Sequence, residues 1–313
     1  MRNISFLHLK FTVRILQDCR MPKQKVSTLT GAMLNKFKRL YCIHCGSDIS
    51  CNNCDCKDIC LVLEMTGKGF DKNIPIAKQP VVSPKFIILC SDGRTEFKEN
   101  DMLEFEIMLF DNLTHLFVQY IYVFDTIGQS GIGSGKIKYK LLYVSDEKGN
   151  IVFSNSALVG NPAVADIFMY ISSRMNDIDS NNGNTVKMSL VSPVMLNAVP
   201  KGDENRIVIF NTRSLSCSIK ERLNIFNMLE KEDEEKLNQL AEDKQAIGSV
   251  NIKITKSRYY IQSERKFITI PVLTGYVVFD ARKISPCLEY FFACEKIGIG
   301  QNMLLGFGRY FMG

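Results

Sequence analysis

Alternating apolar and polar positions begin the chain and predict a β-strand within its first 15 residues. An amphipathic helix and two apolar, strand-like runs come next, and a second helix with a 3.6-residue apolar period leads into a further strand. These segments predict the order βαββαβ. They cover residues 4–15, 28–40, 84–90, 102–110, 113–127 and the run KIKYKLLYV that follows residue 135.

The same order recurs in the second half of the chain. A capping box, Ser218-Ile-Lys-Glu221, predicts the start of one helix, and Ser285-Pro286 supplies an N-cap and a first-turn proline for another. That last helix leads into a glycine-bearing, apolar tail. The strands of this half are predicted at residues 185–194, 250–254 and 272–279.

We therefore predict an α+β protein made of tandem ferredoxin-like (βαββαβ) domains with antiparallel sheets. The N-terminal domain covers residues 1–154 and carries a cysteine-rich insertion at residues 42–60. Residues 155–184 are polar, contain glycine and are interpreted as a linker or surface loop. The C-terminal domain covers residues 185–313 and ends in the glycine-rich segment.

Two Gly-apolar-Gly units, Gly298–Gly300 and Gly306–Gly308, lie between the last helix and the apolar tail. Glycine reaches backbone angles that are closed to other residues, and successive free N–H groups in such a loop can bind phosphate. The segment therefore indicates a phosphate-bearing partner. Gly131-Ile-Gly133 has a similar place in the first half, and we align it with Gly306-Phe-Gly308, at an offset of 175 residues.

Charge changes this picture only slightly. Basic residues outnumber acidic residues by 39 to 33, a net charge of +6, which is compatible with a nucleic-acid partner. Acidic residues gather in the run at 230–243, a face that RNA would avoid. No apolar run approaches the roughly 20 residues of a bilayer span, and the first strand lacks the continuous apolar core of a signal peptide. We therefore expect a cytoplasmic protein without a membrane partner or a disulfide framework.

Six of the eleven cysteines fall within one short segment after the first helix. The pairs Cys42/Cys45 and Cys51/Cys54 supply four thiolates for a tetrahedral, structural zinc ion. Because the pairs are closer together than in zinc ribbons, Cys42 or Cys45 with Cys51, Cys54 and Cys60 is an alternative ligand set. An iron–sulfur cluster and a metal-free loop are the other hypotheses.

The C-terminal pattern resembles that of the repeat-processing CRISPR endoribonucleases of the RAMP superfamily. The resemblance is carried by Arg258-Tyr259, by Gly275–Phe279 and by the run from Gly298 to Tyr310. It extends more weakly to Gly131–Gly135 and to the cysteines after the first helix. The family implies two ferredoxin-like domains with the glycine-rich loop close to RNA.

This resemblance also implies an activity. Family members bind CRISPR repeat RNA and cut the precursor transcript into guide units, without a metal or other cofactor for catalysis. The RNA's 2′-hydroxyl attacks the adjacent phosphate and leaves a 2′,3′-cyclic phosphate and a 5′-hydroxyl. The alternative is a non-cleaving RAMP-type subunit that holds guide RNA in a CRISPR effector complex. A zinc-dependent module unrelated to RNA is a third hypothesis.

The predicted catalytic residue is His44, which follows the basic first helix where the family places its general acid or base. A metal-ligand or bystander role competes, because cysteines flank it. Lys36, Lys38 and Arg39 on that helix are predicted phosphate contacts, against the alternative of a solvated helix face.

The second half supplies the other predicted RNA contacts. Some family members carry a histidine and a lysine where this chain has Gly298 and Gln301. The loop is therefore predicted to hold phosphate, with the cutting groups elsewhere. The predicted RNA-binding residues of this half are Arg258, Tyr259, Gly298, Gly300, Gln301, Gly306, Gly308 and Arg309.

Overall fold

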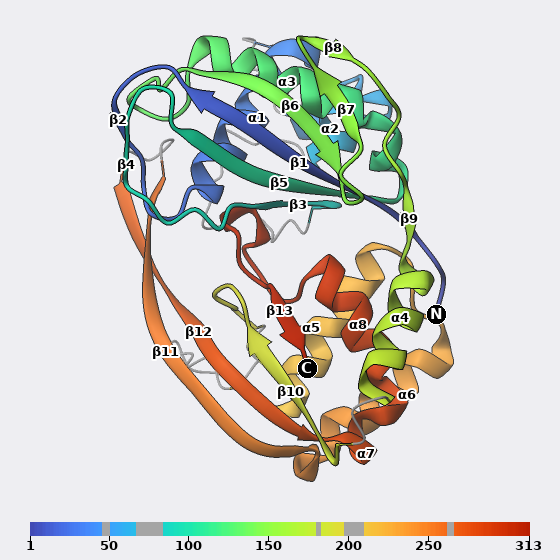
Figure 1. The fold of residues 1–313 in the computed structure, drawn as a ribbon. Helices are drawn as coiled ribbons and strands as arrows, with labels where there is room; N and C mark the ends of the chain where they lie inside the picture. Colours follow the sequence, from blue (N-terminus) through green and yellow to red (C-terminus); the bar gives the residue numbers. More distant parts are fainter. Residues whose placement is uncertain (46–50, 67–83, 180–182, 197–209, 262–265) are drawn as a thin grey trace. The chain divides into compact units, whose positions relative to one another are not determined.

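The chain divides into two compact units in the computed structural model. The N-terminal unit consists of Ser5–Ala165, and the C-terminal unit joins Met1–Ile4 to Asp166–Gly313. The structure, drawn in Figure 1, describes residues 1–45, 51–66, 84–179, 183–196, 210–261 and 266–313.

The N-terminal unit contains β1 (Ser5–Ile15), β2 (Cys19–Arg20), α1 (Val26–Tyr41), α2 (Leu61–Thr66), β3 (Phe86–Leu89), β4 (Glu96–Phe97), β5 (Met102–Phe110), α3 (Phe117–Ser130), β6 (Tyr139–Asp146), β7 (Ile151–Ser154) and β8 (Ala157–Leu158). Its main sheet has the strand order β3-β5-β1-β6-β7-β8, with antiparallel pairs throughout. β1 is therefore central, and α1 and α3 are the two crossover helices of a βαββαβ fold.

Alternation along β1 separates the two faces of this sheet. Its residues 7, 9, 11 and 13 are fully buried. The ring of Phe11 stacks on Phe105 of β5 at 5.0 Å and meets Phe124 of α3 at 5.3 Å. Phe37 of α1 packs edge-on against Tyr120 of α3 at 4.9 Å. Both helices thus cover the apolar face, and the other face of β1 carries its polar side chains.

The C-terminal unit contains α4 (Ile167–Asp179), β10 (Thr185–Leu190), α5 (Thr212–Ile225), α6 (Lys231–Glu242), β11 (Ile247–Ile261), β12 (Lys266–Asp280), α7 (Ala281–Ile284), α8 (Leu288–Ile297) and β13 (Tyr310–Met312), while β9 (Ala165–Asp166) lies at the unit boundary. Its antiparallel sheet has the order β11-β12-β10-β13. Strand for strand this repeats β3-β5-β1-β6, with α5 and α8 in the places of α1 and α3. The prediction of tandem ferredoxin-like folds with antiparallel sheets is confirmed.

Two local predictions need correction. Residues 155–184 were expected to form a linker or surface loop, but α4 occupies residues 167–179 of this segment. Its buried Ile167 and Ile171 lie one turn apart, but residues 167–171 are all apolar or aromatic and residues 172–179 are mostly polar, so the sequence shows no clear helical period. The helix expected from an N-cap at Ser218 has its N-cap seven residues earlier, because Asn211 accepts a hydrogen bond from the N–H of Ser214 and forms the capping box there.

None of the helices in the described ranges combines the length and the apolar character of a bilayer span.

Candidate nucleic-acid interface

The terminal glycine loop begins where α8 ends. A Cβ at Gly300 would lie 2.3 Å from the carbonyl oxygen of Met195, and one at Gly308 would lie 2.2 Å from that of Ile299. Real Cβ atoms do not approach this closely, so two backbone segments can meet here only because these residues are glycines. Positive φ values, between 74° and 89°, are shared by Gly298, Gly300, Gly306 and Gly308.

Many N–H groups of this loop already donate within the protein. The pairs, written donor to acceptor carbonyl, are Gly298–Cys294 (2.7 Å), Ile299–Gly308 (2.9 Å), Gln301–Met195 (2.8 Å), Gly306–Met303 (2.9 Å) and Gly308–Pro193 (2.9 Å). An N–H that donates to a carbonyl is not a free phosphate donor. The hypothesis of a cradle made of successive free N–H groups is therefore wrong for these positions. RNA contact through the side chains of Gln301 and Arg309 stays a prediction.

The internal repeat has a different register from the predicted one. Gly131 ends α3 as Gly298 ends α8, with φ of 83° and 77°. Each donates its N–H to the carbonyl four residues earlier, at 2.7 Å in both cases. Gly131-Ile-Gly133 thus corresponds to Gly298-Ile-Gly300, an offset of 167 residues, and not to Gly306-Phe-Gly308.

The end of the glycine loop is part of the core. Phe307 packs against Val272 of β12, and the buried Tyr310 donates its hydroxyl hydrogen to the carbonyl of Phe291 in α8. The N–H of Arg309 donates to Oγ of Ser192 at 3.0 Å. The motif residues therefore hold the last strand in place, and only Arg309 of these three has a partly exposed side chain.

Three basic side chains lie along β11. Lys253, Lys256 and Arg258 are exposed, and Arg258 lies opposite Thr269 of β12. Lys256 and Arg258 are two residues apart and share one face of the strand. The side chain of Tyr259, a predicted RNA-stacking residue, lies outside the described part of the chain. Exposed cations on an extended strand suit contacts with a phosphate backbone.

His44 lies in the turn after α1, where the N–H of Cys45 donates to the carbonyl of Cys42 at 3.1 Å. Its Nε2 lies 2.9 Å from Oδ1 of Asp55, and 29% of its side chain is exposed. The hydrogen bond to His44 is the main reason that the pKa of the Asp55 carboxyl lies below its usual range. A carboxylate bonded to an imidazole fixes the ring's orientation, as acid–base catalysis requires.

The three predicted phosphate contacts on α1 have different surroundings. Lys36 and Lys38 are half-buried, and Arg39 is exposed. Lys38 lies one turn before Cys42, and both line a small cavity. Phosphate binding by these three cations stays a prediction, and Arg39 is the one best placed to reach a ligand from solvent.

The cysteine segment contains two 3-10 helices, η1 (Cys51–Asn53) and η2 (Lys57–Ile59). Among the predicted metal ligands, Cys45 is exposed and does not line the cavity. The cavity is lined instead by the other four, Cys42, Cys51, Cys54 and Cys60. In the described part of the chain, the potential metal ligands whose donor atoms all lie within 4.8 Å of one another are His44, Cys54, Asp55 and Cys56.

His8 lies on the polar face of β1 and contacts two glutamates. Its Nε2 lies 2.8 Å from Oε2 of Glu106, and its Nδ1 lies 3.8 Å from Oε1 of Glu147. Burial opposes a charge on His8, but the hydrogen bonds and attraction of the two glutamates outweigh it and raise the pKa of the imidazole. No sequence signal joined these residues, because each comes from a different strand or turn.

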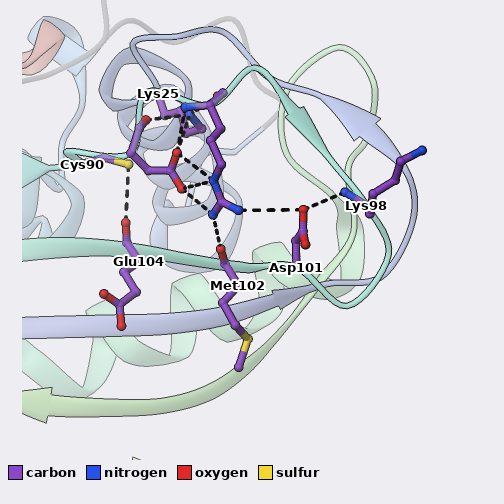
Figure 2. A network of polar contacts seen from close by, with 8 residues as sticks. Lys25, Cys90, Lys98, Asp101, Met102 and Glu104 are labelled. Carbon is purple, nitrogen blue, oxygen red and sulfur yellow. Dashed lines mark hydrogen bonds and ion pairs between the residues drawn. The ribbon is translucent and has the colours of Figure 1, made fainter.

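Lys25, which precedes α1, is a second group that the sequence did not reveal. Only 2% of its side chain is exposed, and its Nζ donates to the carbonyls of Asp92 and Arg94 at 2.7 and 2.6 Å (Figure 2). Arg94 in turn bonds the carboxylate of Asp92 and the carbonyl of Met102. Burial lowers the pKa of Lys25. This network ties the start of α1 to the segment before β5 and so positions the helix that leads to His44.

Solved structures resemble this fold over nearly the whole chain. A chain of a partial Cas6-RT-Cas1–Cas2 complex matches with a TM-score of 0.57 and 14% identity, covering 99% of this chain and 46% of that one. This chain thus spans about half the length of that relative. A Cas6 product complex matches with a TM-score of 0.56 at 11% identity, covering 98% of this chain and 100% of the other. Thermus thermophilus Cas6 matches with a TM-score of 0.51 at 11% identity, covering 100% of both chains.

The protein therefore has a Cas6-like fold. No curated protein matches its sequence. A family model named AF_1859_N and described as an N-terminal domain matches residues 4–163, slightly more than half of the chain. The protein belongs to the AF_1859_N family.

Proposed function

We propose that the protein is an endoribonuclease that binds CRISPR repeat RNA and cuts the precursor transcript into guide RNA units. The observation that carries this proposal is the His44–Asp55 pair, which directly follows a basic helix in a chain with a Cas6-like fold. A histidine held by a carboxylate is the group that proton transfer at an RNA phosphate needs.

Cleavage proceeds by attack within the RNA. The 2′-oxygen bonds to the adjacent phosphorus as its proton passes to a base, and the bond from phosphorus to the 5′-oxygen breaks as an acid protonates that oxygen. The products are a 2′,3′-cyclic phosphate and a 5′-hydroxyl. His44 serves as the acid or the base, and Asp55 orients its imidazole. The step itself needs no metal ion, because proton transfer and nearby cations supply the chemistry.

Cations on both units bind the RNA phosphates in this proposal. Lys36, Lys38 and Arg39 of α1 lie directly before the His44 turn in the chain. Arg258 of β11 and Arg309 of the glycine loop contribute from the C-terminal unit. Each phosphate contact adds affinity that falls as salt rises, independently of the base sequence.

A second function is a non-cleaving subunit that holds guide RNA in a CRISPR effector complex. The glycine loop favours it, because the positions where some relatives carry a histidine and a lysine are here Gly298 and Gln301. A cleavage assay separates the two functions, since both require RNA binding and only one requires cutting.

The test uses the full chain with an end-labelled repeat RNA from the host's own CRISPR array, in a buffer with EDTA. We expect one cut, a cyclic phosphate end, and no cut when the nucleotide before the cleaved phosphate is 2′-deoxy. His44→Ala should lower the rate constant by about 100-fold or more, with RNA affinity retained. His115→Ala is the matched control, because His115 is exposed on another segment.

The outcomes are distinct. Tight binding without cutting overturns the endoribonuclease and supports the guide-RNA subunit. Cutting that persists in His44→Ala overturns the assignment of His44 and leaves the activity standing. Neither binding nor cutting overturns both functions.

A further inference from the structure

Four cysteines meet at one small cavity beside the end of α1. The cavity measures about 20 Å³, which is room for about one water-sized occupant. Each of the four is partly buried and carries a free thiol. The residues that line the cavity are Cys42, Cys51, Cys54 and Cys60, together with Lys38, Val62 and Leu63.

Backbone hydrogen bonds hold the three short segments that carry these cysteines. Cys42 follows α1 directly, and its N–H donates to the carbonyl four residues earlier at 3.1 Å. The N–H of Cys54 donates to the carbonyl of Cys51 at 3.4 Å, which folds this Cys-x2-Cys pair into a turn. Cys60 ends η2 and directly precedes α2. A Cys-x2-Cys turn with two further cysteines is a usual ligand set for structural zinc.

Lys38, Val62 and Leu63 complete the wall of the cavity, and the lining surface is apolar. Val62 and Leu63 add apolar surface that limits access of water. Four protein ligands leave no open position, so such a site is structural and not catalytic.

A competing ligand set shares Cys54 with the cavity. Its other members are His44, Asp55 and Cys56. In that set the Asp55 side chain is 79% exposed and already bonds His44, and three members are consecutive in the chain. The cavity set offers four thiolates and no carboxylate, and four cysteines are a usual donor set for structural zinc. We therefore favour the cavity set.

We propose that Cys42, Cys51, Cys54 and Cys60 bind one zinc ion as a tetrahedral four-thiolate site that joins the end of α1 to the start of α2. Binding releases the four thiol protons to solvent, and the sulfurs close to Zn–S distances of about 2.3 Å. The ion fixes both ends of the segment that carries His44, so it positions this residue without touching RNA. The site stands independently of the proposed cleavage.

The test is the metal content of the full chain, purified without added metal and measured by elemental mass spectrometry. We expect about one zinc per chain in the wild type. Cys42→Ser, Cys51→Ser, Cys54→Ser and Cys60→Ser should each lose most of it. Cys45→Ser and Cys56→Ser are matched controls from the same segment and should keep it, as should Asp55→Ala.

A second measurement uses only the wild-type chain, so that the proposal can be tested even if the cysteine variants do not fold. Titration of the wild-type chain with a thiol-reactive mercurial should release the zinc as four thiols react beyond the exposed free thiol of Cys45 and any other accessible thiol outside the site. A folded wild-type chain without zinc, or with iron in its place, overturns the proposal. Loss of zinc in Cys56→Ser and Asp55→Ala, with zinc kept in Cys42→Ser and Cys60→Ser, overturns the cavity set in favour of the competing one. No RNA is present in these experiments, so their outcome is separate from that of the cleavage assay.

Discussion

Gly300 touches the backbone of Met195 so closely that an added Cβ would lie 2.3 Å from the Met195 carbonyl oxygen. The same carbonyl accepts the N–H of Gln301 at 2.8 Å. The segment after β10 and the glycine loop are therefore held together by backbone contact, at a position where only glycine fits.

Gly300→Ala should destabilise the C-terminal unit by more than about 3 kcal/mol, because the overlap with Met195 adds to the cost of about 1–2 kcal/mol for a positive φ. Gly149→Ala is the control. Gly149 has a similar φ of 84° with nothing within 4 Å of its added Cβ, so only the cost of the backbone angle remains. Urea unfolding of both variants measures the difference. Equal losses would contradict the close contact.

Gly31→Ala should stabilise the N-terminal unit by about 0.5–1 kcal/mol. Gly31 lies inside α1 with a negative φ, and an added Cβ would meet nothing within 4 Å. Alanine restricts the unfolded chain without a steric cost in the helix. Thermal unfolding should show a higher midpoint, and an unchanged or lower one would show that this part of α1 is not helical in solution.

The His8 cluster predicts a pH-dependent stability. The pKa of His8 is raised in the folded state, so its contribution is fully present below the ordinary value of 6.5 and is lost as pH rises through the raised value. His8→Gln should therefore cost more stability near pH 6 than near pH 9. Because both glutamates are more than a third exposed, we expect a difference of under about 1 kcal/mol. A difference that grows toward high pH would contradict the assignment.

Asp55→Asn should slow RNA cleavage by about tenfold or more with unchanged RNA affinity, because the amide cannot balance a charged imidazole. Asp58→Asn is the control, since Asp58 is exposed in the same segment. A cleavage rate of Asp55→Asn equal to that of Asp58→Asn would show that Asp55 does not act through His44.

Arg258→Ala should weaken RNA binding. It should also make the plot of log affinity against log salt concentration less steep, by the amount expected for the loss of one phosphate contact. The matched control is Lys148→Ala, which removes an exposed cation from the turn between β6 and β7. Equal effects of the two variants would show that β11 is not part of the RNA interface.

Local patterns in the sequence were sufficient for the fold. β1 alternates cleanly because one of its faces is buried, and β5 shows the same pattern. α4 was missed because most of its apolar residues are consecutive, at 167–171, and do not repeat with a helical period. The start of α5 was misplaced because a capping-box pattern at Ser218 also occurs inside helices.

The candidate site depends on contacts that sequence patterns cannot show. Glycine predicts a special backbone angle but not which carbonyl the neighbouring N–H binds, and the acceptor at Met195 lies far away in the chain. The pairing of His44 with Asp55 and the grouping of cysteines around one cavity likewise depend on three-dimensional placement. The correct register of the glycine repeat needed the two helix ends to be compared directly.

Residues Met1–Ile4 precede the N-terminal unit in the sequence but belong to the C-terminal unit. The N–H of Arg2 donates to the carbonyl of Met228, and the N–H of Ile167 donates to the carbonyl of Ile4. On the ribosome, the N-terminal unit can therefore complete its sheet once residue 165 has emerged. Met1–Ile4 must wait for partners that are synthesised later, and β13 joins its sheet last of all. Synthesis order thus completes the residues of the inserted unit before most residues of the unit whose sequence flanks it.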